Sequence, residues 1–474
     1  MAPLIAAGLS LIALLVSVQN WRAGFIFVLI AGLLQGPLRK LTLGAPAYYI
    51  LWPAVLFLLV LFFAWQRRQL APIRLLYLED PGLRELWSLF GVLFFLQMVH
   101  AGVRWSPLVP VLGAIEYLVP LAAVLLGAGL ARNPKRIFWY LRWYVFLMVP
   151  AALSVYLSVW YQDAWPILRD VGTFIGKALI IYDMGTVMQS FSGTFRVGEI
   201  ASWHAATGAV FLFILAFYRK RPAFWVLVIL LMLLLAGAII YTGRRKMLLG
   251  LTLFLGLQAL GLGLFYKGVG KWLILAVPLV GLASVAPSFL EEAPKQEYVG
   301  RGLSVFSSAD DRFGTALDLM RSAVIRSSGI GLGVGVYAQG IRYAGIDLSS
   351  AVGGAGEAGM GKLVLELGIP GVLLIVFLGQ RFLVVLLRLL RFLKRQGDSS
   401  LPLLIFLGSY LLTQGAVFSV ATQLFGDPFV LINLGIMMGF FSALLWRAAL
   451  WMKSIRKNRR IVNTSLPIRK EPLS

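Results

Sequence analysis

Long apolar runs recur along the whole chain, and many of them approach the ~20 residues that a helix needs to cross the hydrocarbon core of a bilayer. The overall composition agrees with this pattern. Of the 474 residues, 59% are hydrophobic and only 13% are charged, whereas about a quarter of the residues of an ordinary globular domain are charged. The sequence therefore predicts an integral membrane protein.

The expected fold class is an all-α polytopic membrane protein with about 12 or 13 transmembrane helices, in a single membrane domain over residues 1–474. The first run lacks the basic segment and the cleavage site of a secretory signal, so we expect it to remain as a span. The candidate spans are 3–18, 23–37, 46–64, 87–104, 107–130, 137–158, 203–217, 224–241, 247–265, 272–289, 362–385, 401–421 and 429–450.

A formal net charge of +23 would suggest nucleic acid as the partner of a soluble protein. Here, however, the basic residues form short clusters between the apolar runs, around 67–84, 132–136, 219–221, 267–271, 388–395 and 453–460. Such clusters mark cytoplasmic loops, because basic loops resist translocation. We therefore expect no nucleic-acid partner, and a cytoplasmic tail over residues 451–474.

Two long loops then fall on the external side, at about 159–202 and 290–361, and they hold most of the chain's 20 acidic residues. Within the second loop, Arg312 to Arg326 places Phe313, Leu317, Met320 and Val324 at helical spacing. This pattern predicts a short amphipathic helix on the membrane surface. The cytoplasmic segment 65–86 is too short to form a nucleotide-binding domain, so a substrate must come from the membrane or the external space.

Arg244, Arg245 and Lys246 form a basic cluster at the external end of two spans, where the positive-inside rule disfavours basic residues. One interpretation is a phosphate or diphosphate site, because guanidinium groups bind such anions in a bidentate manner. The alternatives are snorkelling to lipid headgroups or pairing with a loop carboxylate.

Arg312 and Arg196 are further external arginines, for which a local salt bridge is the simpler interpretation: with Asp311 for Arg312, and with Glu199 for Arg196. His204 lies at the membrane edge, where a lone histidine is more often a hydrogen-bonded structural residue than a base. The alternating glycines at 329, 331, 333 and 335 suit either close approach to an anion or a turn between packed elements.

Glu357 stands among glycines, with no adjacent cation before Lys362. A solvated loop carboxylate is the simpler interpretation, but an inverting glycosyl transfer also needs such a group, as the base that takes the proton of the acceptor hydroxyl. The chain has no cysteine and no zinc motif, P-loop or Ser-His-Asp set. We therefore expect neither a metal site nor a cofactor.

The order of these features resembles the O-antigen ligase and polymerase family. The resemblance rests on Thr-Gly-Arg-Arg at 242–245, on Arg312 before Gly-Ile-Gly-Leu-Gly-Val-Gly-Val-Tyr at 329–337, and on Glu-Leu-Gly-Ile-Pro-Gly at 366–371. It covers residues 190–390. Where the family's ligases carry a histidine, the matching position here is Glu357, a departure that favours a polymerase or a ligase with a carboxylate base.

The resemblance implies a glycosyltransferase that polymerises or ligates glycans at the external face of the bacterial inner membrane. Its donor would be an oligosaccharide linked to undecaprenyl diphosphate, and its partners an acceptor glycan, the lipid bilayer and other polysaccharide export proteins. Glu357 would be the catalytic base, and Arg244, Arg245, Arg312 and Arg196 would bind the diphosphate.

Two other functions fit the same composition. A lipid-linked oligosaccharide flippase or polysaccharide transporter would also be all-helical, although transporters usually place ionisable residues along a pathway within the spans. A membrane scaffold for an export complex would tolerate neutralisation of Arg244, Arg245 and Glu357.

Overall fold

The computed structural model describes residues 1–174, 180–183, 186–219, 221–266, 298, 309–343 and 345–465. Its long helices are α1 (Ala2–Gln19), α2 (Trp21–Lys40), α3 (Tyr48–Gln66), α4 (Pro81–Arg104), α5 (Leu108–Leu130), α6 (Pro134–Tyr161), α8 (Gly198–Arg219), α9 (Pro222–Tyr241), α10 (Arg245–Phe265), α13 (Ala309–Arg326), α15 (Gly359–Gln396), α16 (Leu401–Val420) and α17 (Pro428–Ser465).

The short elements lie in the connections. They are the helices α7 (Val171–Phe174) and α14 (Ser349–Val352), the 3₁₀ turns η1 (Ile73–Tyr77), η2 (Pro166–Leu168), η4 (Gln339–Tyr343) and η5 (Gln423–Gly426), and the strands β1 (Ile180–Asp183) and β2 (Thr186–Gln189). The strands form one antiparallel hairpin, with Ile180 opposite Gln189.

Among the described residues, 12 helices are long and apolar enough to cross a membrane. They correspond to every predicted span except 272–289, which lies outside the described residues. The prediction of an all-α polytopic membrane protein is confirmed. The amphipathic helix predicted from Arg312 is also present, as α13, and it begins at Ala309.

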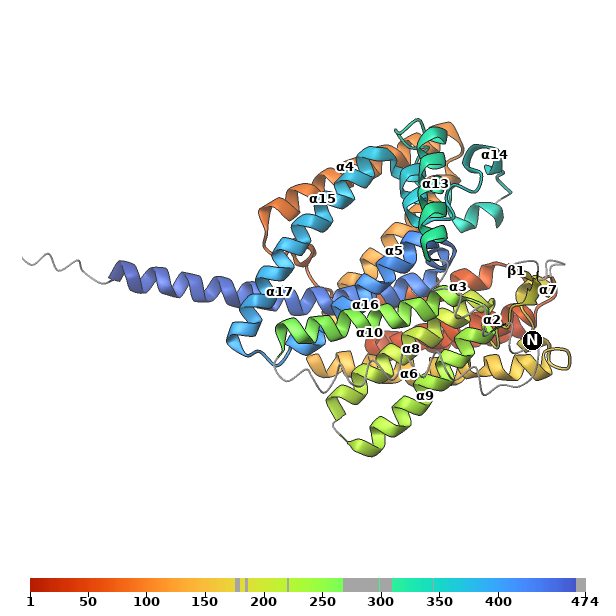
Figure 1. The fold of residues 1–474 in the computed structure, drawn as a ribbon, viewed down its shortest axis with the longest axis horizontal. Coiled ribbons are helices and arrows are strands. Elements are labelled where there is room, and N and C mark those ends of the chain that lie inside the picture. Colours follow the sequence, from red (N-terminus) through yellow and green to blue (C-terminus); the bar gives the residue numbers. More distant parts are fainter. Residues whose placement is uncertain are drawn as a thin grey trace, which may run out of the picture.

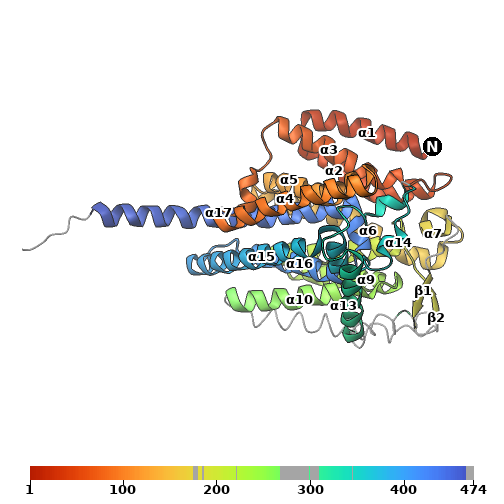
Figure 2. The same cartoon turned by 90° about the horizontal axis from the view of Figure 1, so that it is seen from above.

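Most of the spans pack into one bundle, while α4 and α15 lie beside each other and diverge from it (Figure 1). Figure 2 shows α1, α2 and α3 at one edge of the molecule and α10 and α13 at the opposite edge. A second, smaller core joins the first turns of α5 and α15 to α13 and to the segment between α13 and α15, through residues such as Val109, Ala323, Val336 and Leu365.

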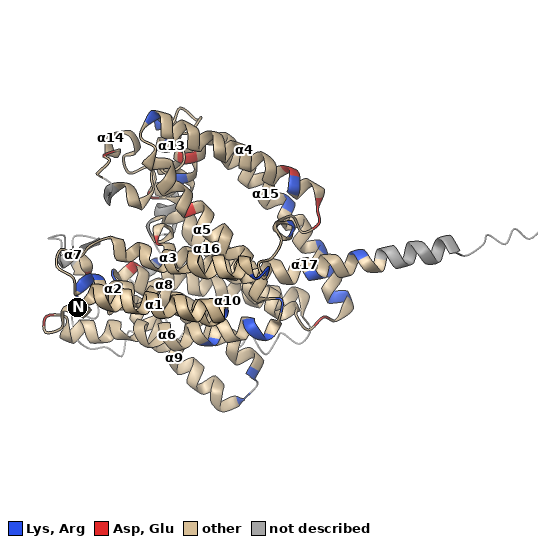
Figure 3. Cartoon of the chain, turned by 180° about the vertical axis from the view of Figure 1, so that it is seen from behind, with Lys and Arg blue, Asp and Glu red and all other residues tan. Residues whose placement is uncertain are grey.

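Lysine and arginine gather where α17 leaves the bundle, and a smaller basic group lies near the other end of the helices, by α2 (Figure 3). We call the end with most of the basic residues the basic end, and the end with β1, α7 and α14 the loop end. The concentration of basic residues at one end agrees with a cytoplasmic orientation of that end.

Candidate functional site

Arg196, just before α8, forms a buried ion pair with Asp427, the residue before α17: Arg196 Nε lies 3.1 Å from Asp427 Oδ2. The partner predicted for Arg196, Glu199, is therefore wrong. The other carboxylate oxygen of Asp427 accepts hydrogen bonds from Phe429 N and Val430 N, so this carboxylate also caps the first turn of α17. The pair fixes the start of α8 against the start of α17.

Glu199 instead pairs with Lys246, which lies in the first turn of α10. Pairing with a loop carboxylate, one of the alternatives considered for the 244–246 cluster, is thus the arrangement found for Lys246. Because Glu199 lies in the first turn of α8, this second ion pair brings α10 to the same place as the Arg196–Asp427 pair.

Two further charges lie beside these pairs. Lys40, at the end of α2, donates to Gly193 O at 2.7 Å and to Ile167 O at 3.1 Å, both in the first long loop. Asp170 accepts from Gly172 N at 2.8 Å. Burial raises the pKa of the Asp170 carboxyl, and the nearby Lys40 and Arg244 oppose that shift.

Arg244 is a residue of the predicted site whose side chain is described. Its side chain is partly buried, and its Nε has no hydrogen-bond acceptor among the residues that the structure describes. Burial lowers the pKa of the guanidinium, and Asp170 is the charge that counteracts this effect. A guanidinium in this position has donors available for an anion.

Together these residues form what we call the loop-end charge cluster: Lys40, Asp170, Arg196, Glu199, Arg244, Lys246 and Asp427. The basic members outnumber the acidic ones by one. Two acids are each bonded to one base, and Asp170 lies near both Lys40 and Arg244. The excess of one basic residue therefore lies in the group formed by these three side chains.

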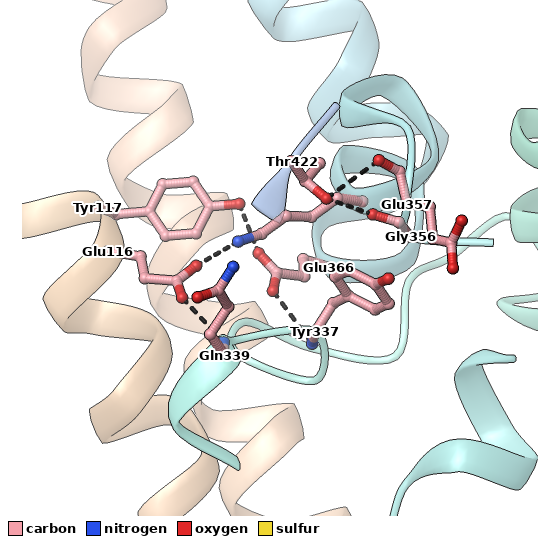
Figure 4. Close-up of polar contacts among 9 residues, drawn as sticks. Glu116, Tyr117, Tyr337, Gln339, Gly356, Glu357, Glu366 and Thr422 are labelled. Carbon is pink, nitrogen blue, oxygen red and sulfur yellow. Dashed lines mark hydrogen bonds and ion pairs between the residues drawn. The ribbon is translucent and has the colours of Figure 1, made fainter. Parts of the chain in front are cut away.

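Glu357 lies just before α15, and its side chain is exposed although its neighbours Gly356 and Ala358 are buried. Its backbone oxygen accepts from Thr422 N and Thr422 Oγ1, both at 3.1 Å, and Gly356 O accepts from the same hydroxyl at 2.8 Å. Figure 4 shows these contacts, with the Glu357 carboxylate directed away from Glu366. Because Thr422 and Asp427 belong to the same short connection between α16 and α17, that connection holds both the Glu357 backbone and Arg196.

The remaining predicted residues are only partly described. The side chains of Arg245 and Arg312 lie outside the described part of the structure, so their contacts, including the predicted pair of Arg312 with Asp311, stay predictions. Helix α13, which begins just before Arg312, packs against α15 and α16. Met320 and Val324 of its predicted apolar face contact the smaller core, whereas Leu317 is 45% exposed.

A buried charge network that sequence reasoning missed lies next to the Glu357 loop. Lys362 in α15 pairs with Glu116 in α5, and Glu366 accepts from Tyr117 Oη at 2.6 Å (Figure 4). Glu366 is 0% exposed and Lys362 6% exposed. An ionisable residue within a span is unusual enough to mark a functional candidate, so the isolated Glu116 in its apolar run was the available signal.

The glycine run 329–335 ends at this network. Glycines 329, 331, 333 and 335 all have positive φ, between +72° and +107°. The amides of the residues between them bind within the fold: Leu332 N donates to Leu365 O at 2.6 Å and Val334 N to Gln97 O at 3.2 Å. The run is therefore a turn between packed elements, the second of the two interpretations.

Two amides just beyond the run do bind anionic groups, but those groups belong to the chain itself. Tyr337 N donates to Glu366 Oε1 at 3.3 Å and Gln339 N to Glu116 Oε1 at 3.1 Å. All four carboxylate oxygens of Glu116 and Glu366 thus have partners. The network joins α5, α15 and the glycine run.

His204 is fully buried in α8, and its Nδ1 lies 2.7 Å from Tyr144 Oη. It packs between aromatic rings, including a stacked Phe195 with ring centroids 4.8 Å apart. The predicted hydrogen bond of His204 is therefore present, while its Nε2 has no partner among the residues that the structure describes.

No group of three or more potential metal-binding side chains occurs in the part of the chain that the structure describes. Comparison of the chain with protein-family models, with curated proteins and with solved structures gives no match in any of the three. The function must therefore be argued from the site itself.

Proposed function

We propose that the protein is a metal-independent glycosyltransferase at the external face of the bacterial inner membrane, polymerising or ligating glycans from an undecaprenyl-diphosphate-linked donor. The observation that carries the proposal is the connection between α16 and α17. Through Thr422 it holds the backbone of the exposed Glu357, and through Asp427 it holds Arg196 of the loop-end charge cluster. A candidate base and a cationic cluster are thereby tied to one short segment.

The proposed reaction needs a base and a cationic group for the leaving diphosphate. Glu357 takes the proton of an acceptor sugar hydroxyl while that oxygen attacks the anomeric carbon of the donor sugar. The bond from the anomeric carbon to the diphosphate oxygen breaks, and undecaprenyl diphosphate leaves with the electron pair. Arg244 and the excess positive charge beside it stabilise the negative charge of the leaving group.

A flippase for lipid-linked oligosaccharides is the second candidate, and one observation favours it. Glu116 lies about 12 Å into α5, at 1.5 Å per residue, and pairs with Lys362 in another span, which is a place where transporters carry charge. Against this candidate, the carboxylates of the network are engaged with partners from the chain itself.

The proposal is tested with purified protein, a lipid-linked oligosaccharide donor, a chelator and no nucleotide. We expect the wild type to produce longer glycans and Glu357→Gln to produce none, because the amide cannot accept the proton. The matched control is Asp163→Asn, which neutralises another exposed carboxylate in a long loop and should leave the product unchanged. Normal glycan lengths from Glu357→Gln would exclude Glu357 as the base.

Arg244 provides the second arm of the same assay. Arg244→Lys keeps the charge but loses the bidentate geometry, so we expect an intermediate rate, and Arg244→Gln should reduce the rate about 10-fold or more, given ~1.5–3 kcal/mol for a hydrogen bond to a charged group. Translocation of the donor across vesicles without any glycan extension would identify a flippase instead.

A further inference from the structure

A cavity of about 420 Å³ lies at the basic end, far along the helices from the loop-end charge cluster. It opens between the start of α6, the end of α8, the end of α15, the start of α16 and the middle of α17. Its volume is within the ~300–1,000 Å³ of typical small-molecule sites. Neither Glu357 nor the loop-end charge cluster contributes to it, so the proposed reaction leaves it unexplained.

The walls of the cavity are amphipathic. Phe138, Leu403 and Leu444 contribute apolar surface, and Tyr218 and Trp451 are the kinds of side chain that concentrate at membrane interfaces. Trp451 is 39% exposed. A ligand in this cavity would therefore meet an apolar wall and an interfacial aromatic rim at the same time.

Arg447 supplies the cationic group of the cavity. Its Nη2 donates to Ala131 O at 2.6 Å and to Arg132 O, which holds the guanidinium in place. Its Nε and Nη1 donate to no other residue within the described ranges, so they remain available to a ligand. A guanidinium fixed through one nitrogen is well suited to a phosphate group.

The surroundings are strongly basic. Four of the helices that line the cavity carry a basic residue within one turn of a lining residue: Lys135 on α6, Arg219 on α8, Lys394 on α15 and Arg447 on α17. The one acidic lining residue, Asp398, accepts a hydrogen bond from Ser400 N at 2.6 Å. Basic pockets between transmembrane helices on the cytoplasmic side bind acidic lipid headgroups.

We propose that this cavity binds the headgroup of an anionic phospholipid from the leaflet at the basic end, with the phosphate on Arg447. Phe138, Leu403 and Leu444 would contact the glycerol and the upper part of the acyl chains. A free anion would gain nothing from the apolar wall, which is why the cavity favours a lipid.

The test is native mass spectrometry of the full chain released from bilayers that contain phosphatidylglycerol and phosphatidylcholine. The wild type should retain phosphatidylglycerol selectively, and Arg447→Gln should weaken that binding about 10-fold or more. Arg388→Gln is the matched control. It removes the same charge from an exposed arginine at the same end, where its charge acts on Asp80 instead of the cavity, and it should retain the lipid.

Arg447 also bonds the residues just after α5, so Arg447→Gln could lose the lipid through loss of folding. A second variant separates these two causes. Ser399→Leu reduces the cavity at an exposed lining residue and leaves every charge in place, so it too should lose the lipid while its melting temperature stays near that of the wild type. Full retention of phosphatidylglycerol by Ser399→Leu would overturn the proposal. So would displacement of the lipid by millimolar inorganic phosphate, which would indicate a site for free anions.

Discussion

Lys362 supplies positive charge beside the two carboxylates that meet between α5 and α15. It pairs with Glu116, while Glu366 receives Tyr117 Oη and Tyr337 N. Each of these buried groups depends on its partners. Removing one partner leaves a buried charge uncompensated, which costs far more than replacing the whole pair by apolar side chains. The network therefore fixes where the glycine run and the Glu357 loop end.

This dependence predicts a strong effect from a single change. Lys362→Met should lower the free energy of unfolding by about 3–5 kcal/mol, because it leaves two buried carboxylates without a cation. The double variant Lys362→Met with Glu116→Gln should recover part of that loss, since one of the two charges is removed with the lysine. Chemical unfolding in mild detergent measures both. Strictly additive effects of Lys362→Met and Glu116→Gln would show that the two side chains do not interact.

Among the elements, α15 shows how local sequence and packing combine. Gly368 interrupts its helical geometry with φ +70° and ψ −179°, and Ile369 N donates to Gly329 O at 2.8 Å. The Glu-Leu-Gly-Ile-Pro-Gly stretch is thus the place where the glycine run crosses the helix. Two segments that suggest the family resemblance separately are parts of one packing arrangement.

Close packing also predicts which glycines in that region tolerate a side chain. A Cβ on Gly333 would lie 2.6 Å from Ala101 Cβ, whereas a Cβ on Gly345 would meet nothing within 4 Å, and both residues have positive φ. Gly345→Ala should cost about 1–2 kcal/mol for the backbone alone. Gly333→Ala should cost about 1–3 kcal/mol more from overpacking. Equal melting temperatures for the two variants would contradict this account of the run.

At the scale of the whole molecule, α4 and α15 form a pair that diverges from the main bundle and is held at both ends. At the loop end the glycine run connects them: Gln97 Nε2 of α4 donates to Ile330 O at 2.8 Å, and Leu332 N donates to Leu365 O of α15 at 2.6 Å. At the basic end, Arg381 forms two hydrogen bonds to Asp80, at 2.8 and 2.9 Å. These ties set the spacing of the pair.

The tie at the basic end depends on pH. Burial by itself would raise the pKa of Asp80, but the hydrogen bonds from Arg381 and Leu83 N outweigh it and hold the pKa below its usual value. The stabilisation is therefore present above the pKa of an unfolded aspartate, about 3.9, and disappears as the pH falls through the folded value.

Asp80→Asn should accordingly lower stability by about 0.2–1 kcal/mol near neutral pH, since asparagine keeps the cap of α4 but not the charge. Melting curves between pH 3 and pH 7 should show the difference from the wild type shrinking at the acidic end. A constant difference over that whole range would indicate that the charge of Asp80 contributes nothing.

The sequence by itself determined the fold class, all the described spans and the amphipathic helix α13. Hydropathy and helical spacing are properties of neighbouring residues, so they can be read without knowing what a segment contacts. Lys40 could have been found in the same way, because it breaks the positive-inside rule as residues 244–246 do.

Only the tertiary structure decided the partners of the charges. Arg196 meets Asp427 rather than the nearby Glu199, and Lys362 meets Glu116 from a distant span. The residues of each pair are more than 200 positions apart in the sequence. Such contacts depend on how the helices are arranged in space, and that arrangement cannot be predicted from the residue pattern of any one segment.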